Sequence, residues 1–343
     1  MSTNFNTGAM WAILLKFQII SMCNFFDTII SIMDTTAIFT TILSLVLIFL
    51  FAIQKFSHQI QLVAGERLKF ILNKWTDTPL KGILSGAFVT SIIQSSTAAS
   101  VILVSLVNAE LIPSFNAISV VIGANIGSTV TAQLIALNMT FIAPIVVIIG
   151  FIIAHTHSRF RRYGKSIFYF GVMFLTLFLI RTLVEPLKDS LEVVAFLHSL
   201  SNPYAAILVG AIITIILQSS SVLTGLVLIL ASQGLVDLPA AIGFMLGAAI
   251  GSPITAVIAS TSASIEAKKV AMANVLFNLI GAAIFIPIIW PLITLLKFTS
   301  DAPAQQIVNA HFIFNIGGAV IAFIFFKQFE KLVRKTTVAL YKK

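Results

Sequence analysis

Long apolar runs separated by short polar loops dominate the chain beyond residue 35. Runs of this length and composition are typical of helices that cross a membrane. We expect crossings at residues 36–54, 115–137, 141–154, 166–180, 239–260, 270–293 and 307–326. Residues 1–35 are less regular, because the apolar stretch 11–33 also carries Lys16 and Asp27. This N-terminal segment is expected either to span the membrane or to lie on its surface as an amphipathic helix.

One further apolar run, residues 82–109, is polar in its middle, where it reads Gln94-Ser95-Ser96-Thr97. As a single helix it would be about 42 Å long, against a hydrocarbon core of about 30 Å. A helix, a break and a second helix fit this pattern, as a re-entrant hairpin over residues 79–109. The tip of such a hairpin has unpaired backbone groups and must line a protein or water-filled cavity. The alternative is one long tilted helix whose polar side chains pack against neighbouring helices.

The same pattern occurs a second time in the chain. When the sequence is shifted by 124 positions, residues 79–133 align with residues 203–257 without a gap, and 21 of the 55 aligned positions are identical. General apolarity would not keep Gln-Ser-Ser and Gly-x-x-x-Gly-Ser in register, so the alignment indicates an internal duplication. A second hairpin is therefore expected over residues 203–233.

Composition places the chain among polytopic membrane proteins. Hydrophobic residues make up 58% of the sequence, charged residues only 10%, and the mean hydropathy is +1.05. The single cysteine, Cys23, excludes a disulfide framework within the chain and a cysteine-rich metal site. The net charge of +9 could indicate nucleic-acid binding, but the basic residues lie in short loops between apolar runs. That distribution is the one found in cytoplasmic loops of membrane proteins, so no nucleic-acid partner is expected.

The basic residues also predict the topology. Of the 21 Lys and Arg, 17 fall in the segments 55–81, 159–165, 268–269 and 327–343, which are therefore expected on the cytoplasmic side. Within the first segment, residues 64–75 are expected to form a short interfacial helix. With these segments inside, the first hairpin enters from the cytoplasm and the second from the opposite side, and the C-terminus is cytoplasmic.

The expected fold is an all-α polytopic membrane protein with two inverted-topology repeats, each with a re-entrant helical hairpin, plus additional C-terminal transmembrane helices. The repeats are assigned to residues 36–156 and 157–297, and the last transmembrane helix and a basic cytoplasmic tail to residues 298–343. Inverted repeats with interrupted helices are common in secondary transporters, which bind their substrate where the interruptions meet.

The residue types at the two tips limit the chemistry. Neither tip carries Lys, Arg, Asp, Glu, His or Cys, so general acid-base catalysis, thiol chemistry and zinc binding are poorly supplied. The helices expected to begin at Ser96 and Ser220 present free N–H groups and partial positive charge, which suit an anion. Carbonyl, hydroxyl and amide oxygens at broken helices suit a hard cation such as sodium. The sequence thus favours a site for an anion together with cations.

Two glycine pairs follow the hairpins, Gly123/Gly127 and Gly247/Gly251. Their small-xxx-small spacing favours close helix packing. The polar residues beside them are placed where exposed carbonyl groups would bind ions: Asn125, Ser128, Thr129 and Ser252.

Taken together, these motifs resemble a known family. The runs Gln94 to Thr97 and Gln218 to Ser221 are each followed about thirty residues later by a Gly-Ala-x-Ile-Gly-Ser run, and these pairs are similar to the signatures of the sodium/phosphate cotransporter family. The resemblance covers roughly residues 40 to 326. It extends to Ala64-Gly65-Glu66-Arg67-Leu68, to Phe277-Asn278, and to the run from Ala310 to Asn315.

The resemblance implies a compact bacterial member that carries inorganic phosphate with sodium as co-substrate across the plasma membrane by alternating access. It implies no enzyme activity, no cofactor besides sodium, the lipid bilayer as surroundings, and allows for a homodimer. The implied phosphate-binding residues are Gln94, Ser95, Ser96, Gln218, Ser219 and Ser220. The implied sodium ligands are Thr97, Asn125, Ser128, Thr129, Ser221, Thr224, Ser252 and Thr255. Secondary candidates for the same site are Thr90, Thr214, Asn278, His311 and Asn315.

Three positions depart from the family pattern. Thr97 replaces the third serine of the first signature and keeps the hydroxyl. Ala249 stands where relatives usually have Asn, and Pro253 where they have Thr, which puts a cation ligand of the second half in doubt. For Asn278 and Asn315, hydrogen bonding between helices is the alternative to ion binding. For His311, the alternative is a packed histidine with satisfied hydrogen bonds.

Three other functions remain open at this point. A related carrier could export phosphate or move another oxyanion such as arsenate or sulfate. An anion channel would conduct without saturating in sodium. A membrane enzyme acting on lipid phosphates is the third, although the expected spans contain no evident nucleophile and base pair.

Overall fold

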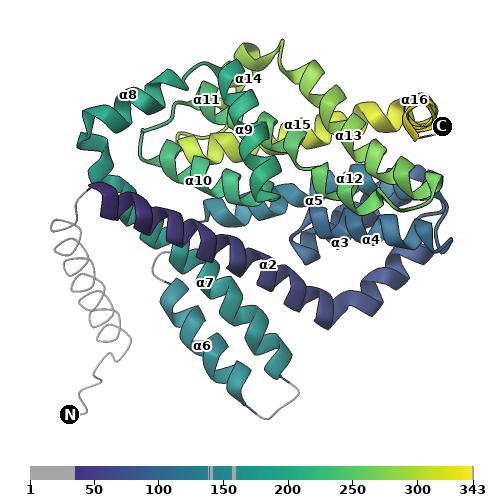
Figure 1. Ribbon diagram of the computed structural model, residues 1–343, viewed down its shortest axis with the longest axis horizontal. Helices are drawn as coiled ribbons and strands as arrows, with labels where there is room; N and C mark the ends of the chain where they lie inside the picture. The colour runs from purple at the N-terminus through teal and green to yellow at the C-terminus, as the bar shows by residue number, and fades with distance from the viewer. Residues whose placement is uncertain (1–34, 138, 140–141, 157–159, 342–343) are drawn as a thin grey trace, which may run out of the picture.

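The computed structural model describes residues 35–137, 139, 142–156 and 160–341, so the predicted N-terminal segment lies outside the described residues except for its last residue (Figure 1). The predicted all-α class is confirmed, since the described residues form helices and no strand. The helices are α2 (Thr35–Lys74), α3 (Pro79–Ile93), α4 (Ser96–Asn108), α5 (Ser114–Ala136), α6 (Ala143–His155), α7 (Arg161–Val184), the 3-10 helix η1 (Glu185–Asp189), α8 (Leu191–Ser199), α9 (Pro203–Leu217), α10 (Ser220–Ser232), α11 (Leu238–Gly251), α12 (Ile254–Ser260), α13 (Ile265–Phe285), α14 (Ile289–Leu296), α15 (Pro303–Ile324) and α16 (Phe326–Tyr341).

Six described segments are long and apolar enough to cross a membrane: Thr36–Gly65, Ser114–Ala136, Arg161–Asp189, Leu238–Ser260, Ile265–Phe285 and Pro303–Ile324. The crossing predicted at residues 141–154 is not among them, because α6 has only 13 residues. A helix of that length extends about 20 Å, less than the hydrocarbon thickness. A multi-span membrane protein is therefore confirmed, whereas the inverted orientation of its two halves stays a prediction.

Three of the predicted segments differ in detail from the helices of the structure. The helix expected at residues 64–75 is continuous with α2, which has 40 residues, no proline and a change of direction in its C-terminal part (Figure 1). The candidate span within α2 ends at Gly65, and the interfacial position of the residues after it stays a prediction. The crossing expected at residues 239–260 matches the candidate span Leu238–Ser260, whose helix is interrupted between α11 and α12 at Pro253. The crossing expected at 270–293 is wrong at its end, because α13 stops at Phe285 and α14 follows Pro287 as a separate helix. Proline lacks the backbone N–H and clashes with the preceding turn, so each helix ends close to it.

Glycines bring the two duplicated helix pairs into close contact, α3 against α5 and α9 against α11. A Cβ atom at Gly123 would lie 1.9 Å from the Ile83 carbonyl oxygen, and one at Gly247 would lie 2.2 Å from the Ile207 carbonyl oxygen. Only glycine allows the two backbones to approach this closely. The packing role expected for these glycines is confirmed, and the two hairpins dock on their following helices in the same way.

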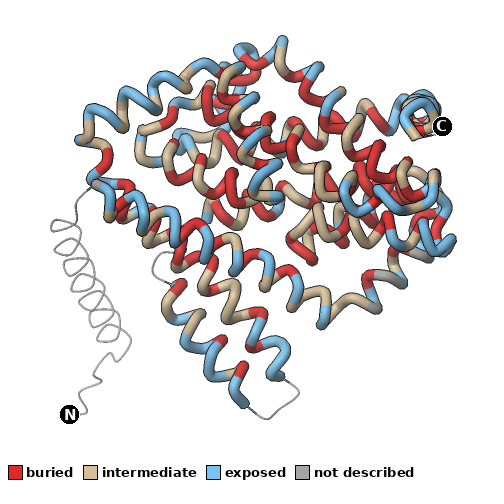
Figure 2. The backbone as a smooth tube through the Cα atoms, in the orientation of Figure 1, coloured by how far each residue is buried: buried red, intermediate tan, exposed pale blue. Residues whose placement is uncertain are grey.

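Burial is concentrated in the central helices α5, α11 and α13 (Figure 2). The hairpin of α6 and α7 extends away from this body (Figure 1). The outer side of α6 exposes large apolar residues, including Ile148 and Ile152. Exposed aliphatic side chains of this kind suit contact with lipid tails.

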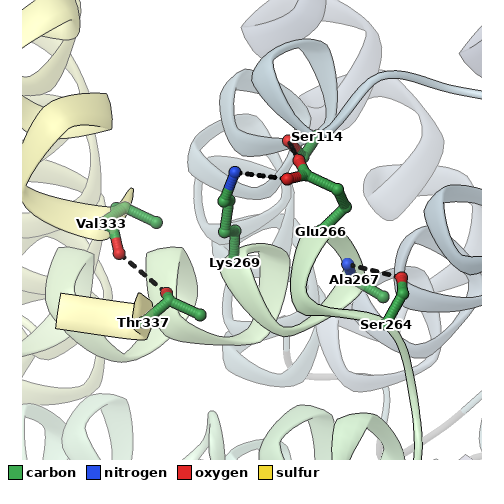
Figure 3. A network of polar contacts seen from close by, with 7 residues as sticks. All are labelled: Ser114, Ser264, Glu266, Ala267, Lys269, Val333 and Thr337. Atoms are coloured by element: carbon green, nitrogen blue, oxygen red, sulfur yellow. Dashed lines mark hydrogen bonds and ion pairs between the residues drawn. The ribbon is translucent and has the colours of Figure 1, made fainter. Parts of the chain in front are cut away.

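A polar cluster joins the two halves of the chain at the N-terminal ends of α5 and α13 (Figure 3). The Ser114 hydroxyl donates to the Glu266 carboxylate, which also pairs with the Lys269 ammonium at 2.5 Å. On the neighbouring α16, the Thr337 hydroxyl donates to the Val333 carbonyl oxygen of its own helix at 2.7 Å. The bond from Ser114 to Glu266 links α13 to the first half of the chain, and α16 lies beyond it at the edge of the molecule (Figure 1).

Candidate functional site

Both duplicated hairpins break at their glutamine. Gln94 (φ 58°, ψ 29°) ends α3 and Gln218 (φ 52°, ψ 27°) ends α9, both in the left-handed conformation. A left-handed residue stops a helix, and for a residue other than glycine it costs about 1 kcal/mol. The next helices begin at Ser96 and Ser220, as predicted. The break is confirmed in both copies, and the alternative of one continuous tilted helix is wrong.

The serine that follows each glutamine occupies the N-cap position of the next helix. Ser95 Oγ accepts a hydrogen bond from the Ala98 N–H at 3.1 Å, so the first tip is capped by its own side chain. Ser219 has the same extended backbone but makes no side-chain cap hydrogen bond. The free N–H groups at the start of α10 are therefore available to another acceptor.

Both tips line one cavity of about 270 Å³. The first tip contributes residues 94–98 and the second residues 218–221, and Thr255 of α12 completes this side. Among the described residues, those that line the cavity include no Lys, Arg, Asp, Glu or His. Positive potential therefore comes from the two helix N-termini, which both reach the cavity wall. Such an arrangement can hold an anion through N–H and O–H donors without a basic side chain.

The six residues implied for phosphate binding all line this cavity. Of the residues implied as sodium ligands, Thr97, Ser221 and Thr255 line it as well, whereas the others do not: Asn125, Ser128, Thr129, Thr224 and Ser252. Ser128 and Thr129 donate to carbonyl oxygens of their own helix, at 2.6 Å and 2.7 Å. Which of these oxygens bind sodium remains a prediction.

A third wall of the cavity comes from α2, which the sequence reasoning missed. Gln54, Ser57 and Gln61 all line it, together with the apolar Ile53. Their spacing of three and four residues places them on one face of the helix. Three uncharged polar residues at that spacing, directly after the apolar run of residues 36–53, were the signal that could have found them.

Asn125 belongs to a buried amide cluster. Its Nδ2 donates to Asn274 Oδ1 at 3.0 Å, and Asn278 Nδ2 donates to Asn125 Oδ1 at 3.2 Å. Asn274 Nδ2 donates in turn to Ser100 Oγ at 3.3 Å. The cluster ties α4, α5 and α13 together, so the hydrogen-bonding role between helices is confirmed for Asn278. Asn274 and Ser100 were not expected from the sequence.

The secondary candidates have different surroundings. The hydroxyls of Thr90 and Thr214 are buried without a hydrogen-bond partner in the described structure. The hydroxyl of Thr255, which lines the cavity, also has no partner there. His311 Nδ1 is also buried without a partner, so the satisfied histidine expected as the alternative is wrong for this atom. Asn315 Nδ2 donates to the His311 carbonyl oxygen of its own helix at 2.9 Å.

The geometry can be compared with known proteins. The sequence pattern of the family described as Na+/Pi-cotransporter matches residues 48–182 and 188–316. The uncharacterized protein YqeW of Bacillus subtilis is 30% identical over 294 residues, which cover 84% of this chain and 95% of that protein. YjbB of Salmonella typhimurium, named as a candidate inorganic phosphate export protein, is 28% identical over 74% of this chain, but the match spans only 47% of YjbB.

A shorter match joins the chain to animal transporters. The sodium-dependent phosphate transport protein 2C of Mus musculus is 38% identical over 98 residues, which cover 27% of this chain and 16% of that protein. No solved structure matches the chain significantly. Because the family pattern covers both repeats and most of the sequence, the chain belongs to the Na+/Pi-cotransporter family.

Proposed function

We propose that the protein is a secondary transporter that carries inorganic phosphate together with sodium, and that phosphate binds between the two hairpin tips. The observation that carries this proposal is the single uncharged cavity lined by both Gln-Ser-Ser tips. Phosphate is a tetrahedral anion with several acceptor oxygens. The N–H groups at the starts of α4 and α10, the serine hydroxyls and the glutamine amides supply donors from two opposite sides.

The charge balance of this site supports the proposed sodium coupling. An anion in a poorly solvated interior is costly unless opposite charge lies close to it. The cavity walls supply partial charges only, so bound sodium ions complete the compensation. The hydroxyl oxygens of Thr97, Ser221 and Thr255 are the ligands we assign there. Thr255 Oγ1 supports this assignment, because it is buried at the cavity without a hydrogen-bond partner and a hard cation prefers such oxygens.

Alternating access would arise from the duplication. We assign the repeats to residues 36–156 and 157–297, in opposite orientations across the plasma membrane. Rocking of one repeat against the other would open the same site to either side in turn. The equivalent glycine contacts of α3 with α5 and of α9 with α11 support rigid units that move as wholes.

The test is uptake of labelled phosphate by purified protein in proteoliposomes, with and without an inward sodium gradient. Ser95→Ala and Ser219→Ala are each expected to reduce sodium-dependent uptake at least tenfold, because each removes a hydroxyl from the site. The matched controls are Ser105→Ala in α4 and Ser232→Ala in α10, whose hydroxyls donate to their own helices outside the cavity. Uptake that is independent of sodium, or normal in both tip variants, would refute the proposal.

Export is the second candidate, because YjbB is named as a candidate for phosphate export. Vesicles loaded with phosphate distinguish the two directions. Under an inward sodium gradient a symporter takes up phosphate, whereas an exporter in its native orientation releases the loaded phosphate. Competition by arsenate and sulfate in the same vesicles measures selectivity among oxyanions. Strong inhibition by arsenate with little by sulfate is the result expected for a phosphate site.

A further inference from the structure

The cavity between the hairpin tips has a polar wall outside the duplicated sequence. Gln54, Ser57 and Gln61 project from one face of α2 into the same cavity as the two Gln-Ser-Ser runs. The helix itself contacts α3, which precedes the first break, and α10, which follows the second break. The three side chains therefore lie within reach of whatever binds between the tips.

These three side chains provide the donors that an anion needs. Gln61 Nε2 donates to Ser57 Oγ at 3.2 Å, so the hydroxyl proton of Ser57 is left to donate elsewhere. Ser57 is only 4% exposed, and burial of a hydroxyl is costly unless it is hydrogen-bonded. The second amide proton of Gln61 and both amide protons of Gln54 are further donors, since no described protein group accepts from Gln54.

Gln61 also borders a second cavity. That cavity, of about 330 Å³, extends along α2 past His58 and Gly65 to Leu72. Leu72 lies two residues before Lys74, at the basic end of α2 that is expected on the cytoplasmic side. Gln61 is therefore the polar residue shared by the central cavity and the cavity that leads toward this end.

The second half of the molecule has no matching wall. The elements that lead to the second hairpin, α7, η1 and α8, contribute none of the described residues that line the central cavity. The contribution of α2 is therefore not repeated by the duplication. The two tips alone would give the site two equivalent halves. The polar residues of α2 make it asymmetric, because the second half supplies no equivalent wall.

We propose that Gln54, Ser57 and Gln61 form a third wall of the anion site, and that Gln61 contacts the anion as it passes between the two cavities. This inference rests on the proposed function, since it assigns further contacts to the same substrate. The selectivity of the site for an anion then depends partly on α2. Its neutral amide donors favour an anion, and a negative charge at the same place would exclude one.

The first experiment introduces charge without changing shape. Gln61→Glu is expected to lower sodium-dependent phosphate uptake at least tenfold, because a carboxylate at the junction repels the anion. Ser57→Ala is expected to raise the KM for phosphate about tenfold with little change in maximal rate, as expected for a lost hydrogen bond to an ion. The matched controls are Gln59→Glu and Gln59→Ala, because Gln59 is half-buried on α2 but lines neither cavity. Changes in Gln61→Glu no larger than in Gln59→Glu would overturn the inference.

The second experiment separates this inference from the proposed function. In a Cys23→Ser background, Gln61→Cys and the tip variant Ser221→Cys are treated with a small charged thiol reagent, with and without phosphate and sodium. Protection of both positions supports the inference, and protection of Ser221→Cys alone overturns it. If neither is protected and the wild-type protein moves no phosphate, the proposed function fails. In that case faster labelling of Gln61→Cys than of Gln59→Cys supports the wall, and equal labelling overturns it.

Discussion

The two hairpin tips have the same Gln-Ser-Ser sequence but differ in how firmly they are held. Gln94 is buried, and its Nε2 donates to the Ser91 carbonyl oxygen, whereas Gln218 is exposed and makes no comparable bond in the described structure. Ser95 caps its helix and Ser219 does not. The first tip is therefore fixed by its own hydrogen bonds, while the second keeps its polar groups free. Identical residues in a duplication can thus make different hydrogen bonds.

The helices that follow the hairpins differ in the same direction. The first, α5, is continuous and carries Asn125 in the buried amide cluster, whereas the second, α11, has Ala249 at the equivalent position and ends before Pro253. The break places Thr255 of α12 at the cavity with its hydroxyl unpaired, while its equivalent Thr131 does not line the cavity. Of these two equivalent threonines, only Thr255 is placed as a candidate ligand of the site.

The largest effect is expected from adding a side chain at the helix crossings. A Cβ at Gly86 would lie 2.0 Å from the Val120 carbonyl oxygen, against 2.7 Å from the Phe244 carbonyl oxygen at Gly210. Gly86→Ala is expected to destabilise the protein by about 3 kcal/mol or more, and Gly210→Ala by less. Thermal unfolding in detergent, followed by loss of the monodisperse peak, measures the difference. Equal losses would show that the two crossings tolerate the same displacement.

A smaller loss of stability is expected at the amide cluster around Asn125, which has no counterpart around α11 because Ala249 occupies the equivalent position. Asn125→Ala removes two hydrogen bonds of the buried cluster, those to Asn274 and Asn278, which costs about 1–3 kcal/mol of stability. Asn274 keeps its bond to Ser100, and Asn278 keeps its bonds to Asn274. The control is Asn116→Ala near the start of the same helix, which removes an amide outside the cluster. Thermal unfolding of both variants is the measurement, and an Asn125→Ala protein as stable as the control would contradict a structural role for the cluster.

The caps should differ by about 1 kcal/mol. Ser95→Ala removes the acceptor of the Ala98 N–H and is expected to cost about 1 kcal/mol of stability, whereas Ser219→Ala should be nearly neutral because Ser219 forms no cap bond. Both variants are nevertheless expected to lose transport. Stability and uptake measured on the same preparations therefore separate the structural role of Ser95 from its proposed role in binding.

The smallest effect concerns the left-handed glutamines. Gln218→Gly should stabilise the protein by up to about 1 kcal/mol, since glycine adopts this conformation without a steric cost. Gln94→Gly should give no gain, because it also removes the buried hydrogen bond to the Ser91 carbonyl oxygen. Unfolding temperatures of the two variants test this order, and a larger gain for Gln94→Gly would reverse the comparison between the tips.

Local signals in the sequence determined much of this architecture. The apolar runs predicted the helical membrane class, the polar centres predicted breaks at Gln94 and Gln218, and the serines predicted helix starts at Ser96 and Ser220. These features depend on neighbouring residues, through backbone capping and the burial of apolar side chains. The duplication added that both breaks should resemble each other, and their backbone angles do.

The tertiary structure alone decided which side chains meet. The polar face of α2 at the cavity, the cluster of Asn125, Asn274 and Ser100, and the loss of Thr131 from the lining all depend on contacts between helices far apart in the chain. Periodicity tells which face of a helix is polar, but it does not tell which neighbour that face meets. That choice depends on the close packing of helices far apart in the sequence, as at the glycine crossings of α3 with α5 and of α9 with α11.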